Sequence, residues 1–114
     1  MRYEEYLYFA RDIFDSISEI EGFISGMGHA DFVKDKKTIN AVIRSLEVIS
    51  KAAKRIPDRV KKKYLGVSWK EIEDREDTLI HKYFEVDAET VWNIATGEIP
   101  VFRLVIEKII DEEE

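Results

Sequence analysis

Apolar residues recur at helical spacing along most of this chain. In the first quarter they form one broad stripe, which includes Leu7, Ala10, Phe14, Ile17 and Ile24. Recurrence every three to four residues is typical of an amphipathic helix with one buried face. The stripe predicts a first helix from Tyr3 to Ile24, and Gly26 and Gly28 are expected to end it, since glycine is common just beyond a helix C-terminus.

A second apolar stripe predicts a long helix that begins near Asp35. Its expected buried positions are Ile39, Val42, Ile43, Leu46, Ile49, Ala53 and Ile56. Pro57 should stop this helix, because proline has no amide hydrogen to continue the hydrogen-bond ladder. The segment 61–66, which is basic at its start and contains Gly66, is expected to be a loop.

A capping pattern predicts where a third helix begins. Ser68 and Glu71 have the spacing of a capping box. In this motif the N-cap hydroxyl accepts a hydrogen bond from the backbone N–H three residues later, and the carboxylate of that later residue accepts one from the backbone N–H of the N-cap residue. This helix should carry both Arg75 and His81. It therefore holds the side chains on which any chemistry would depend.

Two further helices are predicted towards the end of the chain. Asp87 is a suitable N-cap for a short helix through Trp92 that Gly97 would close, and Pro100 fits the first turn of a last helix. No strand pattern, internal repeat or linker interrupts this series. The prediction is an all-α chain, an up-and-down bundle of four or five helices in one domain, residues 1–114.

The composition restricts the classes of protein to which the chain can belong. There is no cysteine among the 114 residues, so disulfides and thiolate metal sites are excluded. The first residues lack the plan of a signal peptide, and no apolar run approaches the roughly 20 residues of a membrane span. A cytoplasmic protein is expected. No glycine-rich phosphate loop and no metal-ligand spacing is found, so no cofactor or metal is expected.

Charge is distributed unevenly along the chain. Residues 34–70 carry twelve basic and three acidic side chains, whereas residues 1–33 carry two and seven, and residues 71–114 carry four and fourteen. A basic middle suits a phosphate-bearing partner such as RNA, and it equally fits a solvated helix face and loop. The candidate RNA-binding residues are Lys51, Lys54, Arg55, Arg59, Lys61, Lys62 and Lys63.

One segment combines catalytic side chains with a recognisable frame. Residues 75–87 read Arg-Glu-Asp-Thr-Leu-Ile-His-Lys-Tyr-Phe-Glu-Val-Asp, and Glu-Thr-Val-Trp follows at 89–92. Five residues separate Arg75 from His81, and Tyr83 comes two residues after the histidine. Together with residues 34–49 and 52–57, this frame resembles the HepT-like branch of the HEPN family over nearly the whole chain. The joined blocks carry the resemblance, because an arginine and a histidine at this spacing occur by chance in many proteins.

The resemblance implies both a fold and an activity. It implies a HEPN-like helical dimer, formed through the motif helix, in which the motifs of both subunits face a shared cleft. It also implies a metal-independent endoribonuclease that serves as the toxin of a type VII toxin–antitoxin system. In that role His81 is the general acid or base and Arg75 holds the phosphate. Taken without the family, His81 would be a structural or helix-capping residue and Arg75 a surface residue paired with Glu71.

The spacing of the motif departs from the usual family pattern. Most relatives have four residues between the arginine and the histidine, which would place the arginine where Glu76 stands here. The shift turns Arg75 by about 100° around the helix, to roughly 120° from His81. Arg75 could still reach the site through its long side chain or through a local bulge in the helix. Asp77, four residues before His81, either orients the imidazole or is a solvated helix acid.

Tyr83 stands where the family has a regulatory tyrosine. In HepT-like systems, a partner nucleotidyltransferase adds AMP to this residue, so the resemblance implies Tyr83 as the AMP acceptor and a cognate minimal nucleotidyltransferase as the antitoxin. The alternative is a tyrosine packed between helices.

Three functions follow from these residues. The first is the RNA-cleaving toxin. The second is a non-catalytic module that binds nucleotide or serves as the helper subunit of a minimal nucleotidyltransferase, in which the displaced arginine marks a degenerate site. The third is a structural dimerisation bundle without RNase activity.

Overall fold

Helices make up almost all of the structure, a computed structural model that describes residues 4–81 and 87–114, without the side chains of residues 76–81. The elements are α1 (Glu5–Ile24), α2 (His29–Val33), α3 (Lys36–Lys54), α4 (Asp58–Lys61), α5 (Trp69–His81), α6 (Ala88–Asn93), a π turn (Ile94–Glu98) and α7 (Ile99–Glu113). No strand occurs in these two ranges. The predicted all-α fold is confirmed.

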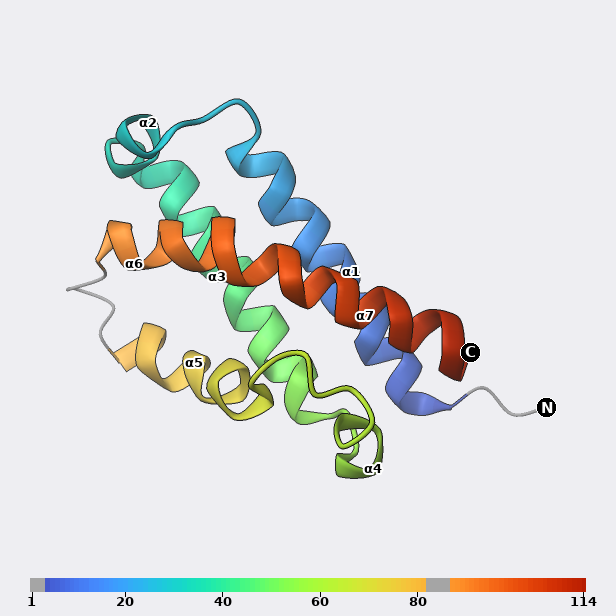
Figure 1. Ribbon diagram of the computed structural model, residues 1–114. Helices are drawn as coiled ribbons and strands as arrows, with labels where there is room; N and C mark the ends of the chain where they lie inside the picture. The colour runs from blue at the N-terminus through green and yellow to red at the C-terminus, as the bar shows by residue number, and fades with distance from the viewer. Residues whose placement is uncertain (1–3, 82–86) are drawn as a thin grey trace.

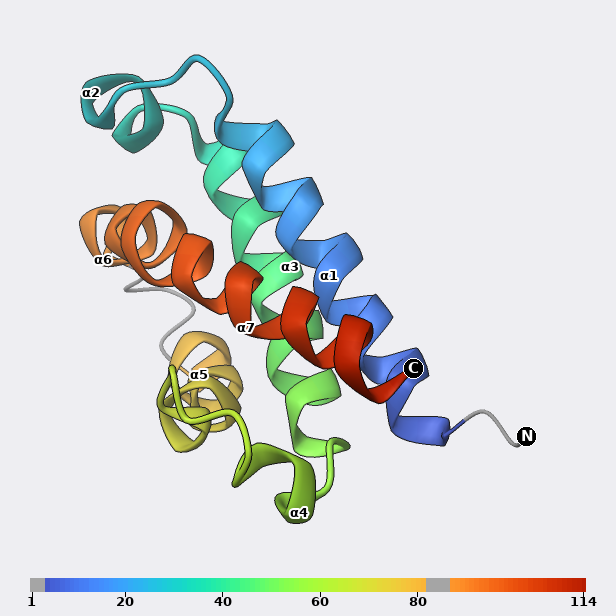
Figure 2. The same ribbon diagram turned by 45° about the vertical axis from the view of Figure 1, so that its right-hand side comes forward.

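The core lies between α1, α3, α5 and α7, with α1 and α5 packed directly against α3. Helices α1 and α3 run side by side, α7 crosses them, and α5 packs against the later half of α3 (Figures 1 and 2). All seven apolar positions predicted for the second long helix are buried, although Ile56 follows the end of α3. On α1 the fully buried positions are Leu7, Ala10, Ile13, Ile17 and Ile20, whereas Phe14 and Ile24 of the predicted stripe are only partly buried. Each fully buried leucine, isoleucine or valine side chain contributes about 1.5–3 kcal/mol relative to the same side chain in water. Among the described helices, none is both long and apolar enough to cross a membrane.

The connection between α1 and α3 contains a short helix that the pattern did not predict. Gly26 adopts a positive φ of 78°, which favours glycine, and it follows the end of α1 as predicted. Helix α2 comes next and is anchored by Phe32, which is fully buried against Trp92 with 5.1 Å between ring centroids. Asp35 then caps α3 by accepting a hydrogen bond from the backbone N–H of Thr38 at 3.0 Å, so the predicted start of the second long helix is confirmed.

The segment after α3 is only partly the loop that was predicted. Helix α3 ends before Pro57, as expected, but residues 58–61 form another short helix, α4. The expected loop of residues 61–66 therefore begins one residue late, because Lys61 still belongs to α4. Within this loop the side chain of Tyr64 is buried.

The prediction that Gly97 closes a separate fourth helix is wrong. Residues 88–113 form one continuous helical run, in which the π turn joins α6 to α7. The backbone N–H of Ile99 donates to the carbonyl of Ile94, five residues earlier, and the hydroxyl of Thr96 donates to the carbonyl of Trp92 at 2.8 Å. Gly97 has no positive φ. The chain therefore absorbs the glycine in a wider helical turn instead of breaking there.

A polar cluster fastens the end of α7 to the opposite end of the chain. Tyr6 donates to Glu113 at 3.0 Å, Tyr64 donates to Glu113 at 2.9 Å, and Lys63 donates to Glu113 at 3.4 Å. The hydrogen bonds from Tyr64 and Tyr6 lower the pKa of Glu113, whereas burial, followed by the bonds to Glu112 and Glu113, raises the pKa of Tyr64. We call Tyr6, Lys63, Tyr64 and Glu113 the C-terminal clamp.

Candidate active site

Helix α5 carries the predicted motif and begins where the sequence places it. The hydroxyl of Ser68 accepts a hydrogen bond from the backbone N–H of Glu71 at 3.4 Å, and the helix runs from Trp69 to His81. Arg75 and His81 are therefore on one helix, as predicted. The side chains of Asp77 and His81 lie outside the described residues, and so does Tyr83.

The first half of α5 is anchored to the rest of the fold at three residues. Trp69 donates its indole N–H to the carbonyl of Tyr64 at 2.8 Å and packs edge to face against Phe102, with 5.4 Å between ring centroids. The hydroxyl of Ser50 donates to the carbonyl of Ile72 at 2.7 Å. Lys61 forms an ion pair with Glu73 at 2.8 Å. These contacts fix the direction of α5 before it reaches the motif.

Arg75 is held from across the fold. Its Nη1 lies 2.7 Å from Oε2 of Glu98, in the π turn, and the two side chains are only 15% and 26% exposed. The structure thus gives Arg75 a partner 23 positions away, rather than the surface pairing with Glu71 that was one interpretation of the sequence. Glu98 therefore belongs to the candidate site. The sequence did not single it out, because nothing in the local pattern relates Glu98 to Arg75.

Helix α5 contains no local bulge that would bring Arg75 onto the face of His81. Residues 69–81 are α-helical throughout, so the six-residue offset places Arg75 and His81 roughly 120° apart around the helix. The one π turn in the described ranges lies between α6 and α7, at the residue that binds Arg75. Any joint action of the two side chains must then use the length of the arginine or a second protomer.

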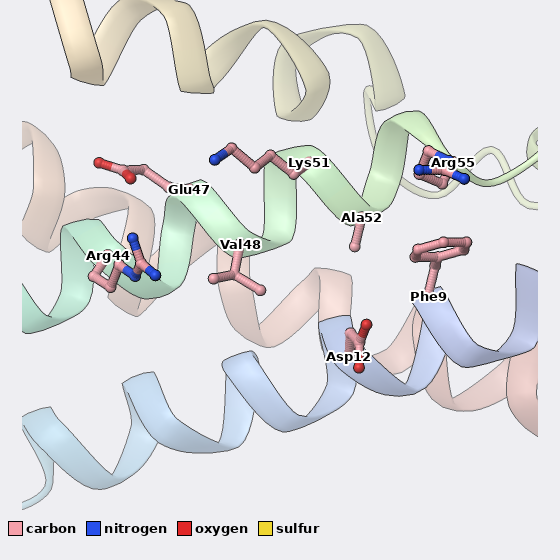
Figure 3. Close-up of a pocket in the computed structure, with 8 residues that line it drawn as sticks. All are labelled: Phe9, Asp12, Arg44, Glu47, Val48, Lys51, Ala52 and Arg55. Atoms are coloured by element: carbon pink, nitrogen blue, oxygen red, sulfur yellow. The ribbon is translucent and has the colours of Figure 1, made fainter.

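A groove between α1 and α3 is lined by three basic side chains. It has a volume of about 440 Å³ and is lined by Phe9, Asp12, Arg44, Glu47, Val48, Lys51, Ala52 and Arg55. Figure 3 shows Phe9 and Asp12 on α1 pointing toward α3, whose Val48 and Ala52 point back toward α1. The guanidinium of Arg55 lies 4.7 Å from the centroid of the Phe9 ring. Two of the candidate RNA-binding residues, Lys51 and Arg55, therefore line the same groove as Arg44, which the sequence did not single out.

The other candidate RNA-binding residues have different surroundings. Lys54 and Lys62 are exposed, Arg59 is exposed beside Glu4 at 3.7 Å, and Lys63 belongs to the C-terminal clamp.

Lys61 is an exception among the candidates. It is only 7% exposed, is paired with Glu73, and lies 5.7 Å from the centroid of the Trp69 ring. A buried, paired ammonium cannot form part of an exposed basic surface, so we leave Lys61 out of the RNA-binding set. The sequence could not separate Lys61 from its neighbours, because its partners are eight and twelve positions away.

Carboxylates and imidazoles do not gather into a metal site in the part of the chain that the structure describes, where no group of three such residues could hold an ion. His29 packs edge to face against Trp92, with 6.3 Å between ring centroids.

Comparisons with known proteins give one consistent result. Residues 13–109 match the family described as Ribonuclease HepT-like. The chain is 42% identical over 106 residues to "Putative RNase MJ0127" of Methanocaldococcus jannaschii, which covers 93% of this chain and 88% of that protein. It is 39% identical over 101 residues to "Probable ribonuclease HepT" of Thermococcus cleftensis, covering 89% and 92% of the two chains. No solved structure matches the chain.

Proposed function

We propose that this chain, which belongs to the HepT-like ribonuclease family, is the RNA-cleaving toxin of a type VII toxin–antitoxin pair. The observation that carries the proposal is the family match over residues 13–109, which contains the whole motif helix α5. The relatives are named "Putative RNase" and "Probable ribonuclease", and these names support RNase activity in this chain. The toxin role and its antitoxin go further and rest on the family resemblance.

In the proposed reaction, His81 and Arg75 divide the work of cleaving an RNA strand without a metal. A general base removes the proton of a 2′-hydroxyl, the 2′-oxygen attacks the adjacent phosphorus, and the bond to the 5′-oxygen breaks. The leaving oxygen takes a proton, so the products are a 2′,3′-cyclic phosphate and a 5′-hydroxyl. His81 is suited to exchange these protons near neutral pH, and the guanidinium of Arg75 is suited to the charge that builds on the phosphate.

The positions of Arg75 and His81 around α5 favour a site shared by two protomers. Arg75 and His81 are roughly 120° apart on a regular helix, and Arg75 is tied to the π turn on its own side. We propose a homodimer formed through α5, in which Arg75 works beside the His81 of the partner subunit. A twofold axis would then give two equivalent sites in one cleft.

The exposed basic residues form the proposed path of the RNA backbone. These are Arg44, Lys51, Lys54, Arg55, Arg59, Lys62 and Lys63, which extend from the groove on α3 to the segment after α4. Each phosphate contact makes binding more dependent on salt, with a slope of about 0.7 per contact for a single strand.

The proposal also includes control by a nucleotidyltransferase. AMP attached to Tyr83 would bring negative charge and bulk to within two residues of His81, and both would oppose the approach of an RNA phosphate.

One observation favours a second candidate, the non-catalytic helper subunit of a minimal nucleotidyltransferase. Arg75 is displaced by one position from the usual family spacing, and a carboxylate already occupies one edge of its guanidinium. A degenerate site of this kind would bind nucleotide or partner without cleaving RNA.

A cleavage assay in EDTA tests the proposed function. Chain made without a nucleotidyltransferase is incubated with transfer RNA and messenger RNA, beside His81→Ala, Arg75→Ala and the control His29→Ala. The control removes the other histidine of the chain, which lies in α2 against Trp92. With all proteins at the same concentration, we expect cyclic phosphate ends from the native chain and from the control, and none detected from the two site variants.

The same assay distinguishes the two candidates. An unmodified, dimeric chain that cleaves none of the RNAs would contradict the nuclease and favour the helper subunit. Cleavage by Arg75→Ala at the native rate would contradict the role given to the arginine.

The RNA path has its own test. In the His81→Ala background, a Lys51→Gln and Arg55→Gln double variant should weaken binding of a labelled RNA and flatten its salt dependence by about 1.4. The control is Lys34→Gln with Lys36→Gln, which removes the same charge at exposed positions outside the groove. Equal effects of the two double variants would contradict the proposed path.

A further inference from the structure

The π turn determines the direction of Glu98. Compared with an uninterrupted α-helix, a single π turn adds about one residue, which rotates the following side chains by about 100°. Glu98 is the last residue of this turn, and its carboxylate points at Arg75 of α5. The carbonyl of Trp92, just before the turn, is bound by the hydroxyl of Thr96. Hydrogen bonds therefore continue through the wider turn, and Glu98 at its end points toward α5.

The pair of Arg75 and Glu98 is less exposed than most ion pairs among the residues that the structure describes. Arg59 and Glu4 are 59% and 56% exposed, and Lys70 and Asp74 are 87% and 59% exposed, so solvent screens those pairs. Arg75 is 15% exposed and Glu98 is 26% exposed, with 2.7 Å between the paired atoms. At this burial the ion pair restricts the guanidinium to one orientation more effectively than a surface pair would.

Glu98 occupies only part of the guanidinium. The contact uses Nη1, and an arginine has five N–H donors in a planar fork. Among the described side chains, Glu98 is the partner of Arg75, so the other edge of the fork is left for a second acceptor. A phosphate can bind that edge through two parallel hydrogen bonds.

We infer that Glu98 is a positioning residue for Arg75, which it orients so that the open edge of the guanidinium receives the RNA phosphate. The inference rests on the proposed ribonuclease function. A free arginine loses rotamer freedom when it binds phosphate, whereas an arginine held by Glu98 has already lost it. In this role Glu98 acts only through the direction that it gives to Arg75.

The test compares Glu98→Gln with Glu107→Gln. Glutamine keeps the size of the side chain and an acceptor oxygen but removes the charge that holds Arg75. Glu107 is the matched control, because it is a partly exposed glutamate of α7 that also faces an arginine, Arg103, at 3.7 Å. Steady-state RNA cleavage, the melting temperature and the oligomeric state are measured for both variants and for the native chain.

We expect Glu98→Gln to lower kcat about ten- to a hundredfold, because a catalytic group misplaced by about 1 Å loses up to about a hundredfold in rate. Its melting temperature should fall a few degrees below that of Glu107→Gln, because Arg75 is only 15% exposed and keeps only a neutral partner. Both variants should still be fully folded at the assay temperature, and the kcat of Glu107→Gln should be native. In an Arg75→Ala background, assayed at raised protein concentration, Glu98→Gln should cause no further loss, because a residue that acts only through Arg75 has nothing left to position.

The outcomes separate this inference from the proposed function. A native chain that does not cleave RNA contradicts the function itself. A native chain that cleaves RNA and depends on Arg75, but is unchanged by Glu98→Gln, contradicts the inference alone. Faster cleavage by Glu98→Gln also overturns it, because Glu98 would then restrain Arg75 rather than orient it.

Discussion

The C-terminal clamp makes a sharp prediction about stability. Tyr64 is 7% exposed, and its hydroxyl lies 2.9 Å from a carboxylate oxygen of both Glu112 and Glu113. A phenol has one proton, so the two carboxylates share one donor. Tyr64→Phe removes that donor and leaves two carboxylates facing each other across the space of the lost hydroxyl.

The size of the effect follows from the charge of the acceptor. A hydrogen bond to a charged group contributes about 1.5–3 kcal/mol, and Tyr6 and Lys63 still bind Glu113 in the variant, so we expect a loss of about 1.5–2 kcal/mol. For a domain of this length the entropy of unfolding is about 0.24 kcal/mol/K, which converts that loss into a fall in Tm of roughly 6–8 °C.

The assay is thermal unfolding followed by circular dichroism. All variants are compared at one protein concentration, because a dimer would make Tm depend on concentration. Tyr8→Phe is the control, since it makes the same chemical change at a side chain that is 59% exposed, where we expect a change below about 0.5 kcal/mol. If Tyr64→Phe melts within about 2 °C of Tyr8→Phe, the clamp does not stabilise the fold.

Three further predictions concern pH, a buried cation and the π turn. Hydrogen bonds from Tyr64 and Tyr6 lower the pKa of Glu113 in the folded chain, so its contribution is present above the unfolded pKa of about 4.3 and is lost as the pH falls through the lower folded value. Between about pH 5 and pH 3 the Tm of the native chain should thus fall more than that of Glu113→Gln, and parallel curves would contradict this origin. Lys61→Gln should cost about 1–2 kcal/mol, because it leaves Glu73 unpaired while 27% exposed, whereas Lys62→Gln at an exposed position should be nearly neutral in urea unfolding. Gly97→Ala should stabilise the chain by about 0.5–1 kcal/mol, because the residue is helical and an added Cβ meets nothing within 4 Å; a lower urea midpoint would refute this.

The helices were predictable wherever a local pattern determines them. The stripe on α3 is buried as expected, and Asp35, Ser68 and Asp87 accept the backbone hydrogen bonds expected of capping residues. Capping depends on groups two or three residues apart, which a sequence displays directly. The same logic failed at Gly97, because a glycine favours a helix end but does not require one when the flanking helices both pack against the core.

The candidate site was predictable only as far as its contacts are local. The position of Arg75 on α5 follows from the capping pattern, but its pairing with Glu98 depends on how α5 and the π turn meet in space. Lys61 was misplaced for the same reason, since its charge looks like that of Lys62 until Glu73 and Trp69 are folded against it. The roles of His81 and Tyr83 stay predictions.

The C-terminal clamp also bears on how the chain could be re-engineered. It brings the last turn of α7 against the first turns of α1, and Arg11 pairs with Glu114 at the same end of the bundle (Figure 1). Ends that meet in this way suit circular permutation, because a short linker between them adds little closure entropy. New termini at the exposed turn between α1 and α2 would leave the motif helix and the π turn within one uninterrupted segment. Such a permutant would add a covalent connection to the noncovalent attachment of α7 to α1.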